Sequence, residues 1–179
     1  MTLKNPSIAI FGSAFNPPTL GHADAVNYLL QTDKFDLIYL VPSYSHAFAK
    51  QMLDYTIRTE MLNAFVSDLK LENVKALSVE HEIAAPSTPV YTYDLLTYLS
   101  KTTLKGAQLT FVIGPDNQEN WHKFYKSDVI VEKWGLCVVP ERKKVRSSLV
   151  RSALSQQKSV SDMLTHSVEQ IINSKQLYR

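Results

Sequence analysis

Short, continuously apolar runs alternate along this chain with longer segments of helical spacing, and this alternation limits the fold more than any other feature. In five runs, apolar residues occupy almost every position: 7–11, 37–41, 74–79, 109–113 and 136–139. Continuous runs of this length are typical of strands in a parallel sheet that is covered on both faces. The sequence therefore predicts a buried parallel sheet.

Between and after these runs, apolar residues recur three and four positions apart, as on one face of a helix. The segments are 21–30, 55–69, 92–100, 147–154 and 162–174. Strand followed by helix, repeated, predicts an α/β fold with a doubly wound parallel sheet of five or six strands and helices on both faces. No repeat or linker divides the chain, so we expect one domain over residues 1–179, with a C-terminal helical part from about 147 to 179.

Composition excludes several classes of protein. The single cysteine, Cys137, permits neither an intrachain disulfide nor a thiolate metal cage, and its apolar surroundings predict a core position. The net charge of +2 excludes a strongly basic nucleic-acid coat. No stretch approaches the roughly 18 apolar residues of a membrane span, and the opening MTLKNPS has no apolar leader. We expect a cytoplasmic protein without nucleic-acid or membrane partners, and no protein-bound metal.

The first strand is followed by the turn GSAFNPPTLGH, residues 12–22. Ligands of open α/β sheets bind beyond the carboxyl ends of the strands. Gly12 would let a nucleotide approach the strand end, and a helix starting near Gly21 would present free N–H groups to an anion. Thr19 and His22 stand close enough on such a helix to face one phosphate. Neither G-x-x-x-x-G-K-[ST] nor G-x-G-x-x-G is present. A capped helix with an incidental histidine explains these residues equally well.

The string GSAFNPPTLGH resembles the signature of the nucleotidyltransferases marked by [H/T]-x-G-H, and among them the nicotinate or nicotinamide mononucleotide adenylyltransferases. The segment VRSSLVR, residues 145–151, is similar to their second motif, I-S-S-T-x-[IV]-R. The resemblance extends over the whole chain, through TPVYTYDLL, FVIGPDNQENW and the C-terminal tail. Three residues depart from it: Thr19 replaces a His, Asn16 an Asp, and Arg146 the first Ser of the second motif.

The resemblance implies a Rossmann-like sheet and the transfer of AMP from ATP to the phosphate of a pyridine mononucleotide, with release of pyrophosphate. Such chemistry depends on positioning and charge stabilisation, and the attacking phosphate needs no general base. The expected catalytic residues, which donate to the phosphates, are His22, Thr19 and Arg151. Ser147 and Ser148 are expected to cap a helix that holds the outer phosphates, and Mg²⁺ is expected to arrive with ATP. The full set expected at ATP is Gly12, Ser13, Phe15, Asn16, Gly21, His22, Ser147, Ser148 and Arg151.

The second substrate is expected at another set of residues: His46, Lys50, Arg58, Tyr91, Thr92, Gly114, Asp116 and Trp121. In this interpretation Lys50 and Arg58 contact its phosphate, Asp116 its ribose hydroxyls, and Trp121 stacks on the pyridine ring. Ordinary packing explains Trp121 equally well, and a solvated loop position explains Lys50.

The remaining histidines, His81, His122 and His166, are expected at the surface or at helix caps. Two alternatives stay open. The acceptor could be another phosphorylated molecule, such as pantetheine phosphate, or the protein could be a nucleotide sensor without catalysis. The choice between nicotinate and nicotinamide depends on one or two hydrogen bonds and is not fixed by the sequence. The oligomeric state is also not predicted.

Overall fold

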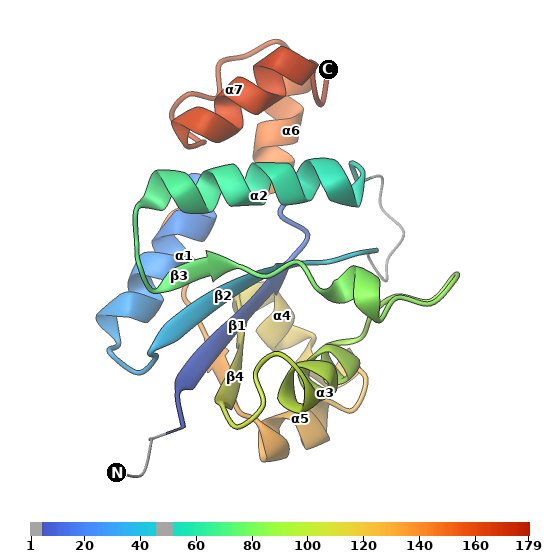
Figure 1. Ribbon diagram of the computed structural model, residues 1–179. Coiled ribbons are helices and arrows are strands. Elements are labelled where there is room, and N and C mark those ends of the chain that lie inside the picture. Colours follow the sequence, from blue (N-terminus) through green and yellow to red (C-terminus); the bar gives the residue numbers. More distant parts are fainter. Residues whose placement is uncertain (1–4, 46–51) are drawn as a thin grey trace.

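The computed structural model describes residues 5–45 and 52–179 and is built around a parallel sheet (Figure 1). Within these residues five strands lie in the order β3-β2-β1-β4-β5. Their bounds are β1 Ser7–Ser13, β2 Leu37–Pro42, β3 Val74–Ala76, β4 Gln108–Ile113 and β5 Leu136–Val138. Strand β1 is central, because Ile8 lies opposite Leu37 of β2 on one side and Leu109 of β4 on the other. The predicted doubly wound parallel sheet is confirmed.

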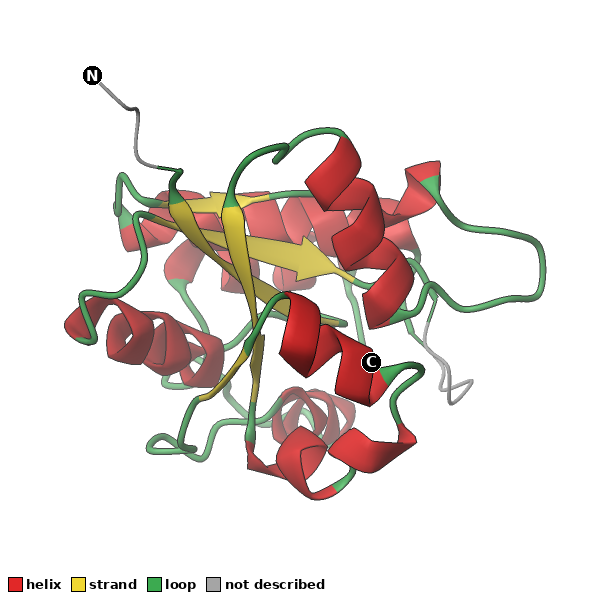
Figure 2. Cartoon of the chain, turned by 90° about the horizontal axis from the view of Figure 1, so that it is seen from below, coloured by secondary structure: helices red, strands yellow, loops and turns green. Residues whose placement is uncertain are grey.

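Helices cover both faces of this sheet, as Figure 2 shows from below. They are α1 Leu20–Gln31, α2 Tyr55–Leu69, α3 Thr92–Lys101, α4 Pro115–Glu119, α5 Ser127–Lys133, α6 Ser147–Ser155 and α7 His166–Lys175. Two short 3-10 helices, Glu80–Glu82 and Trp121–Lys123, lie between them. No helix among the described residues is long and apolar enough to cross a membrane.

The sheet separates two hydrophobic cores, and β1 contributes to both because successive side chains point to opposite faces. Ala9 and Phe11 join one core with α1 and α2, whereas Ile8 and Ile10 join the other with α3 and α5. This double burial explains why the strand is apolar at consecutive positions.

The C-terminal helices extend the first core away from the sheet. Val150 of α6 and Val168 and Ile172 of α7 are fully buried in it. Helix α2 lies between the sheet and α7 (Figure 1). The C-terminal helical part therefore shares its core with the strands and the first helices.

Most predicted elements agree with the structure to within one or two residues, and the larger differences lie at the third strand, after β4 and at α7. The third strand ends at Ala76 rather than at residue 79, because the chain turns there toward the 3-10 helix. The segment after β4, where the sequence predicts no helix, contains α4, the second 3-10 helix and α5. Helix α7 starts at His166 rather than at residue 162. These helices are short, so their periodicity is weak in the sequence.

Candidate functional site

A cleft of about 310 Å³ opens at the carboxyl ends of β1, β4 and β5. It lies where the strand order reverses, between β1 and β4, the position at which open α/β sheets bind ligands. Three segments line it. They are the end of β1 and the start of α1, with Gly12, Ser13 and His22, the start of α4 with Gly114, and residues 139 to 147. The two sequence motifs therefore face one another across this cleft.

His22 is the third residue of α1 and forms a capping box with Thr19. Its Nδ1 atom accepts a hydrogen bond from the backbone N–H of Thr19 at 2.9 Å. In the neutral ring the proton must then be on Nε2, which lies 3.5 Å from Oγ of Ser13 at the cleft wall. Burial lowers the pKa of His22 to about 4. At neutral pH the imidazole is therefore an uncharged hydrogen-bond donor toward the cleft.

Phe15 supports this histidine from behind. Its ring is fully buried, and its centroid lies 4.8 Å from that of the His22 imidazole. Phe11 contacts the imidazole from a second direction, at 6.0 Å. The expected contact of Phe15 with ATP does not fit the structure, because the side chain lies outside the cleft lining and is inaccessible. Phe15 instead orients the ring of His22.

Thr19 and Gly21 join the first motif to the second. The Thr19 hydroxyl donates to the carbonyl oxygen of Val145 at 2.7 Å and accepts from the N–H of Gly21 at 3.1 Å. A Cβ atom on Gly21 would lie only 2.4 Å from the same Val145 oxygen. Thr19 lines the cleft, but its proton is already donated and its side chain is fully buried, so the structure gives no support for a direct contact with a phosphate. Thr19 is a positioning residue.

Gly12 also has a packing role. A Cβ atom there would lie 3.3 Å from the ring of Phe111, on the neighbouring strand β4. The absence of a side chain thus lets β1 pack closely against this aromatic ring, while the backbone of Gly12 lines the cleft.

The second motif starts α6 in a different way from the expected serine cap. The N-cap residue is Arg146, and Ser147 and Ser148 are the first two helical residues. The hydroxyl of Ser147 donates to the carbonyl of Pro17 at 2.7 Å, while Ser148 is exposed beside an adjoining hollow. Their backbone N–H groups belong to the first turn, where no intrahelical acceptor exists. These N–H groups, rather than the hydroxyls, are suited to an anion.

Asn16 holds the turn together from inside. It is buried, and its side-chain oxygen accepts from the hydroxyl of Tyr178 at 2.6 Å. Its backbone oxygen accepts from Nη1 of Arg151 at 2.9 Å. Asn16 therefore does not fit the expected role at ATP, since it is absent from the cleft lining. The hydrogen bond from Arg151 to the Asn16 backbone oxygen fixes one guanidinium nitrogen and leaves the other donors of Arg151 available.

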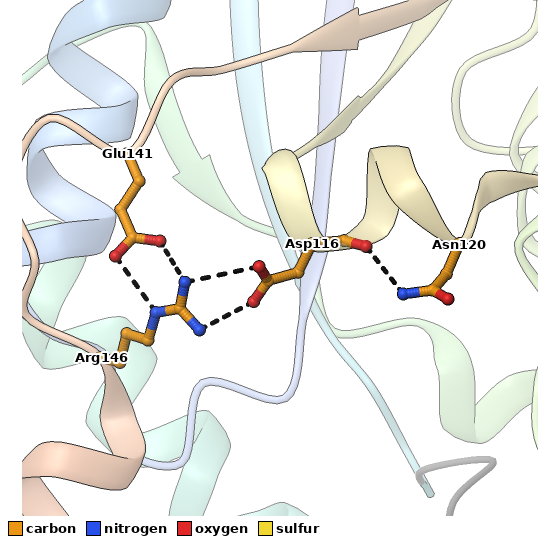
Figure 3. A network of polar contacts seen from close by, with 4 residues as sticks. All are labelled: Asp116, Asn120, Glu141 and Arg146. Carbon is orange, nitrogen blue, oxygen red and sulfur yellow. Dashed lines mark hydrogen bonds and ion pairs between the residues drawn. The ribbon is translucent and has the colours of Figure 1, made fainter.

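An ion-pair network spans the cleft from β4 to β5, and Figure 3 shows it. Arg146 donates to Asp116 at 2.8 Å and to Glu141 through Nε at 3.1 Å. This contact with Arg146 holds the pKa of Glu141 below its ordinary value and raises that of Arg146. Asp116, expected at a ribose, lines the cleft, but its carboxylate is paired with a cation.

Arg58 does not reach the cleft. It is buried, and its guanidinium donates to four backbone oxygens, those of Leu53, Ala14, Ser43 and Tyr44. Burial lowers its pKa. All of these bonds are to the protein itself, so the expected phosphate contact is wrong. Arg58 ties the loops after β1 and β2 to helix α2.

The other residues expected at the second substrate are only partly brought together. Gly114 lines the cleft, whereas Tyr91, Thr92 and Trp121 do not. Tyr91 and Thr92 stand at the start of α3, where Tyr91 packs on Tyr125 with centroids 5.1 Å apart.

Trp121 packs against Phe124, with ring centroids 4.7 Å apart, and its buried Nε1 has no hydrogen-bond partner within residues 5–45 and 52–179. His46 and Lys50 lie outside the described residues.

Several residues of the site carried no recognisable signal. Tyr178 and Arg142 lie far along the chain from the turn they support, and Arg142 forms a two-pronged ion pair with Asp24 of α1 at 3.0 and 3.1 Å. Glu80 is buried beside the loop after β2, where it accepts from the N–H of Tyr44. Burial raises the pKa of Glu80 to about 7. The roles of these three residues depend on contacts between segments that are distant in the sequence, so they become visible only in the structure.

No cluster of three or more His, Cys, Asp or Glu side chains suited to a metal occurs in the part of the chain that the structure describes. The cleft carboxylates are instead paired with arginines, Asp24 with Arg142 and both Asp116 and Glu141 with Arg146.

Comparison with known proteins agrees with this geometry. A crystal structure from Vibrio parahaemolyticus, described as a candidate nicotinate-nucleotide adenylyltransferase, is 38% identical with a TM-score of 0.83, covering 97% of this chain and 96% of that one. A relative from Cytophaga hutchinsonii, assigned the same name, is 28% identical over 195 residues, which is 96% of this chain and 97% of the relative. The nicotinic acid mononucleotide adenylyltransferase of Plasmodium falciparum, solved with NaAD, shares the fold at 15% identity and a TM-score of 0.78, covering 97% of this chain and 98% of that one.

The family model described as cytidylyltransferase-like matches residues 10–171, which include both sides of the cleft. Because that match covers most of the chain, from the first strand to the last helix, this protein belongs to the cytidylyltransferase-like family.

Proposed function

We propose that the protein transfers AMP from ATP to nicotinate mononucleotide, forming the dinucleotide and releasing pyrophosphate. The single observation that carries the proposal is the joining of the two phosphate motifs at one cleft, through Thr19, Gly21 and Val145. The full-length likeness to nicotinate-nucleotide adenylyltransferases supports the same reaction.

The cleft supplies what adenylyl transfer needs. The attacking phosphate is already an anion, so the protein must mainly place two phosphates in line and stabilise the charge that develops. Nε2–H of His22 is a neutral donor held in a fixed orientation, which suits it to the α-phosphate. The N–H groups of Ser147 and Ser148, with the free donors of Arg151, suit the departing pyrophosphate.

Mg²⁺ is proposed to enter with the triphosphate. The arginine-paired carboxylates do not form a cage of their own, and Mg²⁺ commonly binds through phosphate oxygens and water with few protein ligands. When bound, the ion would neutralise phosphate charge. The residues described above would position the phosphates themselves.

Nicotinate mononucleotide is proposed as the preferred acceptor over the nicotinamide form. Helix α3 starts at Thr92 after Tyr91, and no side chain in the described part of the chain caps it. Its first N–H groups are therefore free to bind the ring carboxylate, whereas the amide would direct its own NH₂ toward these donors.

The test supplies Mg-ATP with either mononucleotide, or with pantetheine phosphate, and measures pyrophosphate release and the mass of the product. We expect turnover with nicotinate mononucleotide and a lower kcat/KM with the nicotinamide form. Turnover with pantetheine phosphate alone would assign another acceptor. If the protein binds ATP but releases no pyrophosphate in the presence of any of these acceptors, it is a sensor and the proposal is refuted. Cell fractionation would test the proposed cytoplasmic location.

A further inference from the structure

Arg146 occupies an unusual place in the cleft. It is the N-cap residue of α6, directly before the N–H groups of Ser147 and Ser148 that are proposed to hold the outer phosphates. Its side chain lines the same cleft. The motif that residues 145–151 resemble has a serine at this position, whereas this chain carries a guanidinium beside the proposed phosphate site.

Among the described residues, the hydrogen-bond acceptors of this guanidinium are two carboxylates and no backbone carbonyl. Arg146 contacts Asp116 through Nη1 and Nη2, at 2.8 and 3.4 Å, and Glu141 through Nε and Nη2 (Figure 3). Its side chain is 54% exposed and that of Asp116 69% exposed. An ion pair as accessible to water as that between Arg146 and Asp116 contributes little to stability, so a stronger ligand can replace Asp116.

The neighbouring cation of the cleft differs in this respect. Arg142 is bound to both side-chain oxygens and the backbone oxygen of Asp24, and to Gln31, all on helix α1. Arg142 is thus anchored to the long helix α1, whereas the described partners of Arg146 are the carboxylates of Asp116, in the short helix α4, and of Glu141, in the loop after β5. A polyphosphate, with several oxyanions, competes well for a guanidinium of this kind because the planar fork fits phosphate oxygens.

We propose that Arg146 is an exchangeable ligand of the ATP polyphosphate, held by Asp116 and Glu141 until nucleotide binds. This inference rests on the proposed function. When ATP binds, the Arg146 guanidinium leaves Asp116 for a phosphate oxygen. The Asp116 carboxylate then becomes free to accept hydrogen bonds from the ribose hydroxyls of the second substrate. The exchange couples phosphate binding to ribose binding without a large movement of the backbone.

The proposed exchange predicts changes in ATP affinity of opposite sign for two variants. Arg146→Ser removes the phosphate ligand and should weaken ATP binding about 10- to 100-fold, the effect of one lost charge-assisted bond. Glu141→Gln removes a competitor for the guanidinium and should tighten ATP binding a few-fold. If Arg146 only held two segments of the cleft together, both variants would bind ATP more weakly than the parent protein.

Calorimetric titration of the whole protein with ATP and with AMP tests this. Arg146→Ser should leave the affinity for AMP within about threefold of the parent protein, since AMP lacks the outer phosphates. The matched control is Lys143→Ser, which removes an equal charge from an exposed residue of the same cleft. It should change ATP affinity less than Arg146→Ser. Arg146→Lys, a folded alternative if the serine variant fails to fold, should show an intermediate loss because lysine has no fork.

The inference is overturned if Glu141→Gln weakens ATP binding, if AMP and ATP lose equal affinity in Arg146→Ser, or if Lys143→Ser has the larger effect. These titrations need no acceptor, so they judge Arg146 independently of the reaction. A parent protein that binds ATP with the expected pattern but forms no dinucleotide would refute the proposed function alone.

Discussion

Gly21→Ala tests the contact that joins the two phosphate motifs. The new Cβ would start 2.4 Å from the carbonyl oxygen of Val145, a backbone atom. The segment before α6 must therefore move by about 0.6 Å to reach even 3.0 Å, the lower limit of real Cβ contacts. The 2.7 Å bond from Thr19 to the same oxygen would be strained or lost.

The magnitude follows from two opposing effects. Overpacking costs typically about 1–3 kcal/mol, and the Thr19 bond about another 1 kcal/mol if it breaks. Replacing glycine by alanine in a helix stabilises it by roughly 0.5–1 kcal/mol, and less near the first turn. We expect a net loss of about 1–3 kcal/mol in the free energy of unfolding. A displacement of this size at the phosphates should also lower kcat/KM by up to about 100-fold.

Urea denaturation and pyrophosphate release measure the two effects. Asn27→Ala, at an exposed position of the same helix, controls for helix propensity and should be neutral or slightly stabilising. Gly114→Ala controls for an added methyl group in the same cleft, because its Cβ meets nothing within 4 Å. If Gly21→Ala is as stable and as active as the parent protein, the reasoning about this contact is wrong.

Four further changes probe the site. His22→Ala should lower kcat about 100- to 1,000-fold and change ATP affinity far less, because its donor meets charge that grows in the transition state; equal turnover in a folded variant would remove His22 from the mechanism. Arg58→Met should cost about 3–5 kcal/mol in urea denaturation, since it leaves backbone oxygens without donors in a buried place; a loss below about 1 kcal/mol would contradict its role as a tie. The pKa of Glu80 is raised from 4.5 to about 7, so the folded state binds the proton more tightly and loses stability as pH rises through this range. Glu80→Gln keeps the acceptor for Tyr44 and cannot ionise, so its stability relative to the parent should rise by roughly 2–3 kcal/mol from pH 4 to pH 8, and a constant difference would refute this. Tyr178→Phe should slow adenylyl transfer several-fold by freeing Asn16 and hence Arg151, with the matched change Tyr125→Phe, at an exposed ring, as control.

The sheet and most helices could be predicted from the sequence because their signal is local. Helix α2 occupies residues 55–69 as expected, since its apolar stripe is long and regular. Helix α5 was missed for the opposite reason: it has seven residues, and Val129, Ile130 and Val131 favour strands. The position of the site was also predictable, because topology places it at the strand ends.

The roles of single residues were harder to predict because they depend on which polar groups meet. Phe15 and Asn16 belong to the correct turn, yet both are buried and lie outside the cleft lining, and the buried Thr19 hydroxyl donates to the protein itself. The charge of Arg58 favours a phosphate contact, whereas in the structure backbone oxygens of two loops, those after β1 and β2, surround it. No sequence pattern shows that a carbonyl 44 residues away lies within hydrogen-bond distance.

The central position of β1 has a consequence for how the molecule could be divided. Its register with β4 pairs Ser7 with Gln108, so the middle of the sheet is formed by segments from opposite halves of the chain. A cut in the exposed segment 85–88 would leave His22 on one fragment and Ser147 on the other, each with part of the sheet. Each fragment would contain only one of the two motifs that form the proposed phosphate site. Nucleotide binding by a mixture of the two would thus report that β1 has paired with β4 and that α7 has packed on α2, which makes the protein a candidate scaffold for fragment complementation.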